Sequence, residues 1–310
     1  MVCCHKSCPL PPNDEGLFLP IHVGAAVSPI DLHMQRDDQV LGEPCDNISA
    51  KNKNYCELTA VYWAWKNIKQ LYPDLQYIGL CHYRRFFDFN TKPPFFRQET
   101  HTIAESALKD KDLFALKEPI TGCDAILPVA VISRSHVIND HLLLCSLLNY
   151  SILETVALKL YPEYKESLRH VFYQSDDVPH RNMFVMKWEL FEQYAQWLFN
   201  ILFEFEKIIK MPAWECEKRL FGYMSENLLP LFCFHNNLSI KRRQILFVSE
   251  PKGSPSLVKI IYKNIANKFW FKVNTFTFHG ILMNSQIPAL KSILKQEGVW
   301  DKIEALKPID

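Results

Sequence analysis

The sequence lacks any apolar run long enough to cross a bilayer, and it lacks an excess of charge of either sign. A membrane-spanning helix needs about 20 predominantly apolar residues, and no segment approaches that length. The 35 Lys and Arg residues are nearly balanced by 34 Asp and Glu residues, which leaves a formal net charge of +1. The composition therefore predicts a globular chain of one or two domains that neither spans a membrane nor binds nucleic acid.

Several nucleotide and catalytic motifs are also missing. There is no Walker phosphate-binding loop, no Gly-x-Gly-x-x-Gly and no Gly-x-Ser-x-Gly. The only Asp-x-Asp triplet, Asp110-Lys111-Asp112, lies in a polar stretch (104–118) that we interpret as a solvated helix. Cys4, His5 and Cys8 are not followed by a second ligand pair at zinc-site spacing. We therefore predict no metal site and assign no cofactor.

The beginning of the chain has no charged segment followed by an apolar one, as a secretory signal would have. The ten cysteines are irregularly spaced. Reduced thiols in a cytoplasmic protein are the simplest interpretation of both features.

Hydrophobic periodicity predicts helices alternating with short buried strands. Helical spacing covers 56–71, 140–160 and 188–209, and compact apolar runs at 77–81, 124–129 and 183–186 are typical of buried strands. This order indicates an α/β fold with a mostly parallel central sheet flanked by helices. Ligands of such sheets bind at the carboxyl ends of the strands, which places 82–85 at the expected site.

The segment His82-Tyr83-Arg84-Arg85 has the chemistry of an anion site. Guanidinium groups remain charged and form bidentate hydrogen bonds with phosphate oxygens, so a diphosphate is a suitable ligand. Neighbouring strand residues point in opposite directions, and the alternative for at least one arginine is a structural ion pair.

Three further polar stretches stand beside predicted elements. Residues 46–67 combine a polar loop with a helix whose amino end could receive phosphate. Residues 176–186 place acids, a histidine and an asparagine before a strand, and 219–227 carry an acid in an apolar helix. A carboxylate can accept a proton from an attacking hydroxyl. For each side chain, the alternatives are a turn cap or a place in the core.

The last sixty residues differ in kind from the rest. Between 251 and 296 there are seven lysines and no acidic residue, and aromatic and aliphatic side chains are interleaved with the lysines. Such a helical segment could lie on an anionic membrane surface. The alternative is a solvated helix that packs its apolar side on the main domain. We predict a domain at 1–250 and a basic, aromatic-rich helical segment at 251–310.

Taken in order, these stretches resemble one family, the domain of unknown function 4422, also classified as glycosyltransferase family 111. Its members are galactofuranosyltransferases of capsule, exopolysaccharide and lipopolysaccharide O-antigen synthesis. The resemblance covers roughly residues 1–250, and Asn227 stands where the family often has arginine. The matching blocks are Val2-Cys3-Cys4-His5-Lys6, 19–26, Asp46-Asn47-Ile48-Ser49, Tyr55-Cys56-Glu57-Leu58-Thr59-Ala60, 62–67, 77–85, 124–128, 182–186 and 219–226.

The resemblance implies a GT-A-like nucleotide-sugar-binding fold, a UDP-galactofuranose donor and inversion to a β-galactofuranosyl product. It implies a glycan or lipid-linked oligosaccharide as acceptor, at the inner face of the cytoplasmic membrane. The alternatives are a transferase for another nucleotide sugar on the same scaffold, or a non-catalytic assembly module that binds glycan or membrane.

On this basis the candidate residues fall into three groups. The base is one of Asp176, Asp177 and Glu226, among which the sequence does not choose. The donor side comprises His5, Lys6, Asp46, Asn47, Tyr55, Glu57, Trp65, Lys66, His82, Arg84 and Arg85. The acceptor side comprises His180, Asn182, Arg219 and Tyr223.

Overall fold

The computed structural model describes residues 1–13, 16–114, 122–135, 137, 145–178, 181–211, 218–250 and 255–309. The chain forms two compact units. The first unit comprises Met1–Val131, Pro179–Ala195 and Leu238–Tyr262, and the second comprises Ile132–Val178, Gln196–Asn237 and Lys263–Asp310. The division of the chain at residue 250 stays a prediction.

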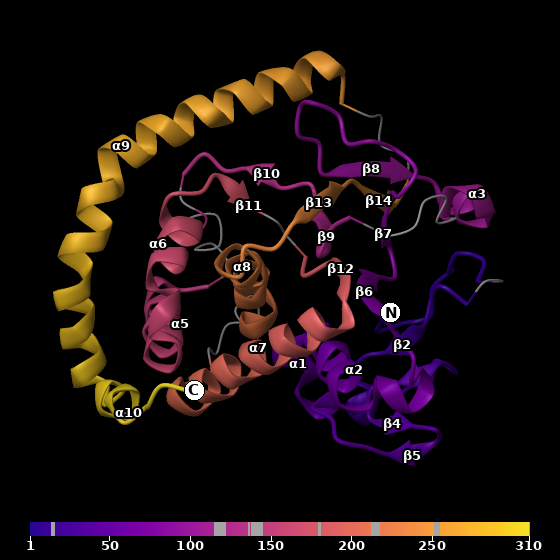
Figure 1. Ribbon diagram of the computed structural model, residues 1–310, viewed down its shortest axis with the longest axis horizontal. Helices are drawn as coiled ribbons and strands as arrows, with labels where there is room; N and C mark the ends of the chain where they lie inside the picture. The colour runs from indigo at the N-terminus through magenta and orange to yellow at the C-terminus, as the bar shows by residue number, and fades with distance from the viewer. Residues whose placement is uncertain are drawn as a thin grey trace. The chain divides into compact units, whose positions relative to one another are not determined.

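A mixed sheet forms the centre of the first unit (Figure 1). Its main path runs β13-β9-β12-β6-β1-β2-β3, and β7, β14 and β8 extend it beside β6. The strands are β1 (Val2–Cys4), β2 (Pro20–His22), β3 (Gln35–Arg36), β6 (Tyr77–His82), β7 (Arg85–Phe87), β8 (Thr100–Ile103), β9 (Ala125–Pro128), β12 (Phe184–Lys187), β13 (Ile240–Arg243) and β14 (Ile245–Val248). A separate hairpin joins β4 (Gln39–Val40) and β5 (Glu43–Pro44).

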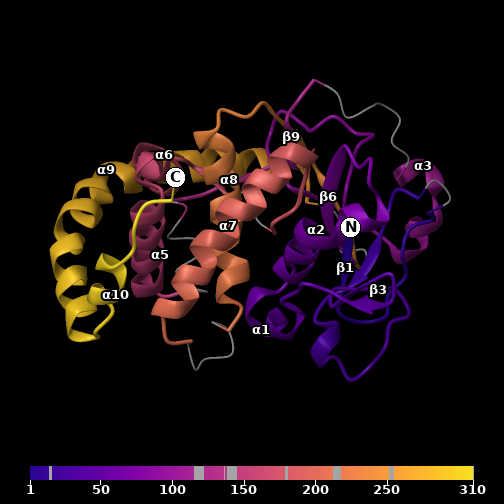
Figure 2. The same ribbon diagram turned by 60° about the horizontal axis from the view of Figure 1, so that its bottom comes forward.

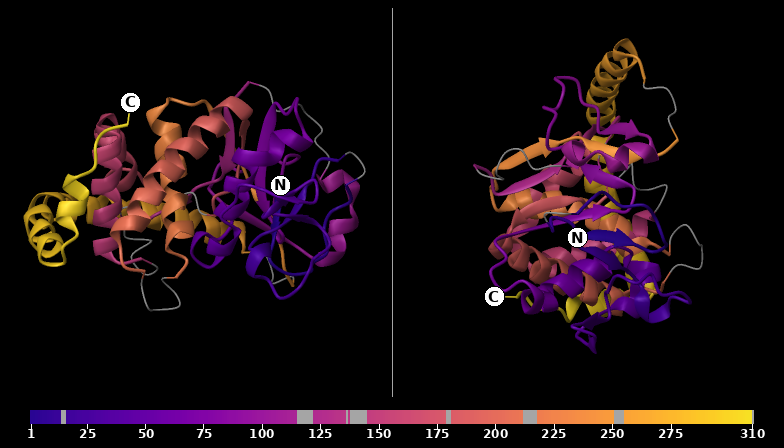
Figure 3. Two further views of the ribbon diagram at one scale, coloured as in Figure 1. Left: turned by 90° about the horizontal axis from the view of Figure 1, so that it is seen from below. Right: turned by 90° about the vertical axis from the view of Figure 1, so that its right-hand side faces the viewer.

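Most pairings in this sheet are parallel, as the sequence predicts. Antiparallel pairing is confined to β12, which pairs with β6 and β9, and to β7, which pairs with β6 and β14. Because β7 runs against both β6 and β14, the strands β1, β6, β14 and β8 all run in one direction. Their carboxyl ends therefore lie at the same edge of the sheet. Figure 3 shows the ribbon from two further sides.

The helix predicted at 56–71 is α2 (Leu58–Leu71), and a short helix, α1 (Asn52–Tyr55), precedes it. Cys56 interrupts them with φ 53°, a conformation that ends a helix. The Asn52 side chain donates to the carbonyl of Cys56 and to Thr59 Oγ1, so it stabilises the break. The polar helix expected at 104–118 is a 3-10 turn, η3 (Glu105–Lys109), followed by α3 (Lys111–Phe114), and 115–118 lie outside the described residues.

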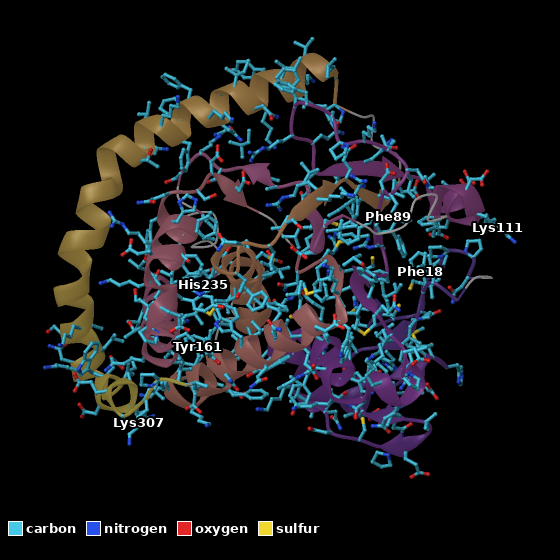
Figure 4. All side chains as sticks on the ribbon, viewed as in Figure 1. Phe18, Phe89, Lys111, Tyr161, His235 and Lys307 are labelled. Carbon is cyan, nitrogen blue, oxygen red and sulfur yellow. The ribbon has the colours of Figure 1, made fainter. Side chains whose placement is uncertain are left out.

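Aromatic side chains fill the space between β7 and α3 in the first unit. The ring of Phe86 meets those of Phe18 and Phe114 edge-on, at centroid distances of 5.8 and 5.4 Å. Phe18 is labelled in Figure 4, together with Phe89, whose ring packs on Phe87. Edge-to-face contacts of this kind add to the free energy gained from burial, so they fix β7 firmly within the sheet.

The second unit is mainly helical. It contains α5 (Leu147–Leu160), η4 (Pro162–Tyr164), α6 (Lys165–Tyr173), α8 (Leu220–His235) and α10 (Trp300–Glu304). It also contains β11 (Asp177–Val178), which pairs with β10 (Val131–Ile132), most of α7 (Trp188–Ile208) and most of α9 (Leu257–Gln296). The helices α6 and α8 pack together and are neighbours in Figures 1 and 2. The first part of the helix expected at 140–160 lies outside the described residues.

A stack of rings joins η4, α7 and α8 within this unit. Tyr164 stacks on His235 at a centroid distance of 3.6 Å and on Trp197 at 5.0 Å. The place of His235 is labelled in Figure 4. Across the ranges that the structure describes, no helix combines the length and the apolar character needed to span a bilayer.

Candidate functional site

A cavity of about 580 Å³ opens in the first unit, where four strands that run the same way end. Residues at the carboxyl ends of β1, β6, β8 and β14 form its wall, and they include Tyr83 and Arg84 of the segment expected at this edge of the sheet. The lining residues are Lys6, Ser7, Cys8, Pro9, Tyr83, Arg84, Ala104, Glu105, Ser106, Leu108, Val248, Ser249 and Glu250.

The ring of Tyr83 organises the basic side of the cavity. Lys6 Nζ lies 5.5 Å from its centroid, the Arg84 guanidinium carbon lies 5.1 Å from it, and His5 meets it edge-on at 5.0 Å. The backbone N–H of Tyr83 donates to the carbonyl of Cys3, which fixes the turn after β6 to the end of β1. Two exposed cations are therefore held on one aromatic ring beside the cavity.

Arg85 begins β7 and is partly buried, with its guanidinium carbon 5.1 Å from the centroid of the Phe247 ring. Its Nε is buried and makes no hydrogen bond within the described part of the chain. Burial lowers the pKa of Arg85, and the positive charges of Arg181 and Arg84 lower it further. Arg181 itself pairs with Glu99. The charge of Glu99 also acts on Arg85, where it opposes part of this lowering.

The structure brings together Glu57, His82 and Asn182, which lie in different motifs of the sequence. The side chain of Asn182 donates to Glu57 Oε1 at 2.7 Å, and His82 Nε2 lies 2.7 Å from the carbonyl oxygen of Arg181. Arg181 and Asn182 both have positive φ, 83° and 49°. Such backbone is costly for residues other than glycine. These contacts therefore hold a strained bend in front of β12.

Trp65 and Lys66 on α2 and Asp46 in the preceding loop form a separate group around Tyr62. Tyr62 donates its hydroxyl hydrogen to Asp46 Oδ1 at 3.0 Å, and burial followed by this contact raises the pKa of Tyr62 to about 12. Lys66 Nζ lies 3.4 Å from the centroid of the Trp65 ring. The side chain of Asn47 closes a turn by accepting from the N–H of Ser49. Asn47 therefore stabilises the loop that contains it.

Three predicted residues of the first unit are in its interior. Tyr55 is fully buried, Glu57 is 7% exposed and Asn182 is 2% exposed. A side chain in such a place acts on a ligand through its neighbours, so we now expect these three to position other groups. We do not expect these three side chains to contact the donor or the acceptor directly.

The remaining predicted residues belong to the second unit or lie outside the described residues. The carbonyl of Asp176 accepts from the N–H of Ser133, and the N–H of Asp177 donates to Ser175 Oγ. Arg219 lies over the ring of Tyr223 at 5.4 Å, one turn apart at the start of α8. Glu226 lies further along α8, and its charge contributes to the raised pKa of Tyr150. His180 is among the residues that the structure does not describe.

Sequence reasoning missed two features of the first unit. Glu105 and Glu250 face the cavity, although nothing in their surroundings in the sequence sets them apart. Asp37 is fully buried, accepts from the N–H groups of Gly24 and Ala25, and receives the hydroxyl of Ser49. The signal for Asp37 was its place between the blocks 19–26 and 46–49, both of which donate hydrogen bonds to its carboxylate.

A metal site was not predicted. Within the described ranges, no group of three or more His, Cys, Asp or Glu side chains is arranged to hold a metal ion. Asp110 and Asp112 of the Asp-x-Asp triplet are exposed, and the N–H of Asp112 donates to Asp110 Oδ1. The triplet therefore forms a surface turn.

The mostly parallel central sheet flanked by helices is that of the GT-A-like fold class, as the solved structure below also indicates. The chain belongs to the family described as "Domain of unknown function (DUF4422)", which it matches over residues 1–237. It is also similar to the solved apo structure of the WbbM bifunctional glycosyltransferase, with 30% sequence identity and a TM-score of 0.67. The similarity covers 83% of this chain and 46% of that one, so this chain spans about half the length of its neighbour. Among curated proteins no match is found.

Proposed function

We propose that the chain is a glycosyltransferase that moves a sugar from a nucleotide diphosphate donor to a hydroxyl group. The observation that carries this proposal is the cavity at the ends of β1, β6, β8 and β14, with Lys6 and Arg84 stacked on Tyr83. The likeness to a bifunctional glycosyltransferase supports the same class of reaction.

In this proposal the basic side of the cavity receives the diphosphate. Arg84 and Lys6 bind its oxygens directly, and Arg85 adds positive charge from the strand behind them. Phosphate accepts bidentate hydrogen bonds from a guanidinium group, and cations stabilise the charge that develops on the departing nucleotide. Because these side chains carry positive charge themselves, the proposal does not require a metal ion to bind the diphosphate.

The finer proposal is transfer of β-galactofuranose from UDP-galactofuranose with inversion. It rests on the family resemblance and on the ordered motifs from Val2 to Glu226. Inversion requires one carboxylate to accept the proton of the attacking hydroxyl. Asp176, Asp177 and Glu226 remain proposed for this role, and Glu105 and Glu250 join them because they line the cavity.

We further propose that the acceptor is a growing cell-surface polysaccharide, as a glycan or lipid-linked oligosaccharide. The place would be the inner face of the cytoplasmic membrane, with the protein held peripherally. A panel of UDP-, GDP- and CMP-sugars offered with an acceptor would identify the donor. Transfer from a different nucleotide sugar would replace galactofuranose and keep the reaction class.

The proposed diphosphate site is tested by UDP binding to Arg84→Ala and Lys6→Ala. Each substitution removes a charged partner of the phosphate, worth about 1.5–3 kcal/mol, so we expect Kd to rise at least about tenfold. Isothermal titration calorimetry measures the Kd. Both side chains are exposed, so the melting temperature should stay close to that of the wild type.

Lys92→Ala is the matched control, because Lys92 is an exposed lysine of the same unit that does not line the cavity. It should bind UDP as the wild type does. If Arg84→Ala and Lys6→Ala also bind UDP normally, the diphosphate does not occupy this cavity. Lys66→Ala then tests the group on α2.

A further inference from the structure

The first half of α9 has its apolar stripe on the outside. Val258, Tyr262, Ile265, Phe269 and Val273 recur at intervals of three and four residues, so they share one face of the helix. Their exposed fractions are 75, 74, 61, 60 and 37%. A helix that packs on a globular protein normally buries such a stripe, and this one does not.

The opposite face of the helix carries Asn267, which is fixed to the second unit by hydrogen bonds. Asn267 is 5% exposed, receives the Arg134 Nε–H at 2.9 Å and donates to the carbonyl of Ile132 at 2.8 Å. One helical repeat further on, Asn274 donates to the carbonyl of Arg134 at 2.7 Å. Hydrogen bonds on this side therefore determine which face of α9 is turned outward. The alternative, a helix that packs its apolar side on the main domain, does not describe this part of α9.

Lysines border the apolar stripe on both sides. At 100° per residue, Lys259 and Lys263 fall on one border, and Lys268 and Lys272 fall on the other. All four are exposed, and there is no acidic residue from 251 to 296. Lysine side chains can extend along an apolar surface and place the ammonium group at its polar boundary.

We infer that the 257–273 face of α9 binds an anionic lipid bilayer, with the apolar stripe in the interface and the four lysines on the headgroups. The inference deepens the proposed function, because a lipid-linked acceptor would meet the protein at this surface. The positive charge of this face favours anionic lipid over a second copy of the chain. Pairing with a second copy would set lysine against lysine, whereas anionic lipid neutralises all four.

Sedimentation with lipid vesicles tests the inference on the full chain. The probes are vesicles of phosphatidylcholine alone and vesicles in which about a third of the lipid is phosphatidylglycerol. We expect binding to the anionic vesicles, much weaker binding to the neutral ones, and a loss of binding as salt rises. Absence of wild-type binding to the anionic vesicles would overturn the inference.

Two double variants separate the contributions. Lys259→Gln with Lys263→Gln should weaken binding at least tenfold, because each lysine contributes about fivefold. Ile265→Asn with Phe269→Asn should weaken it at least as much by removing inserted apolar surface. Both pairs are exposed, so the fold should survive, which circular dichroism checks.

Lys92→Gln with Phe95→Asn is the matched control, since Phe95 is 94% exposed, Lys92 is exposed and neither residue belongs to α9. This variant should bind vesicles like the wild type. Unchanged binding by the α9 variants would contradict the inference. So would a wild-type dimer that these substitutions convert to a monomer, because a second copy would then cover the stripe. UDP binding is measured in parallel, and its absence with vesicle binding intact would remove the proposed function and leave the membrane face standing.

Discussion

At the scale of single residues, the first unit depends on a few buried polar groups that hold its loops. Asp37 is the clearest, because its carboxylate accepts hydrogen bonds from two backbone N–H groups and a hydroxyl while it is fully buried. Gly24, one of the donors, has φ 71°, and a Cβ there would lie 2.8 Å from the Cβ of Asn52. The loop after β2 therefore has little freedom to rearrange.

Asp37→Asn is predicted to destabilise the protein by roughly 2–4 kcal/mol, because one acceptor oxygen is replaced by a donor that faces other donors. Urea unfolding measures the change. Asp31→Asn is the matched control, since Asp31 is an exposed acid in the segment before β3. It should leave the unfolding midpoint close to that of the wild type. A small effect of Asp37→Asn would mean that the loop is held by other contacts.

The residue scale also shows what a single sequence can predict about the site. Arg84 was predicted because its charge suits a diphosphate and it follows an apolar run, and Lys6 was placed on the donor side by the family resemblance. Tyr83, which holds both, stands in the quoted motif but was not assigned a role. Tyr55 and Asn182, predicted on the donor and acceptor sides, are buried, because a polar atom on a side chain does not reveal whether a neighbour such as Glu57 will satisfy it inside the fold.

At the scale of elements, apolar runs located three of the ten strands that the structure describes in the main sheet. The runs expected at 77–81, 124–129 and 183–186 are the strands Tyr77–His82, Ala125–Pro128 and Phe184–Lys187. Short strands have few alternatives once their apolar run is bounded by polar turns. The break between α1 and α2 was not predicted, since it depends on the left-handed φ of Cys56 and on the side chain of Asn52.

The outward face of α9 shows a second limit of prediction from the sequence. Periodicity identifies an apolar stripe but does not say what the stripe faces. The polar contacts of Asn267 and Asn274 with 132–134 decide this, and they join segments more than a hundred residues apart. Only the tertiary structure could choose between the two alternatives for this segment.

The pairing of α5 with α6 predicts a pH dependence of stability. Burial raises the pKa of Glu154 to about 7 from an ordinary value of 4.5, and the hydrogen bond that it accepts from Tyr173 opposes the shift. The folded protein thus favours the protonated acid. Its contribution is full below the unfolded pKa and is lost as pH rises through about 7, a decrease of up to about 3 kcal/mol.

Urea unfolding at a series of pH values measures this decrease. Glu154→Gln keeps the shape of the side chain and cannot ionise, so it should flatten the curve between pH 4.5 and 7. Glu166→Gln is the control, because Glu166 is an exposed acid on α6. It should keep the wild-type dependence. An unchanged slope in Glu154→Gln would assign the pH dependence to another group.

At the scale of the whole molecule, the cavity joins parts of the chain that are far apart in sequence. Its walls come from the segments after β1, β6, β8 and β14, which span residues 6 to 250 of the 310. No single motif contains the site, and the order of the motifs along the chain does not specify their contacts. The pairing of β14 with β7 and β8 brings Ser249 and Glu250 to the wall, so the site is a product of the sheet topology.

Hydrogen–deuterium exchange can test this assembly with one ligand. A ligand that binds only the folded state at a concentration of 100 Kd stabilises that state by about 2.7 kcal/mol. UDP should therefore slow exchange in four separate segments at once, Lys6–Cys8, Tyr83–Arg84, Ala104–Ser106 and Val248–Glu250. Arg84→Ala should need about tenfold more UDP for the same protection, and Lys92→Ala should behave as the wild type. Protection confined to Asp46 and α2 would move the donor to that surface. Protection after β1 and β6 alone would mean that the walls from β8 and β14 do not take part, and the site would then be smaller than the cavity.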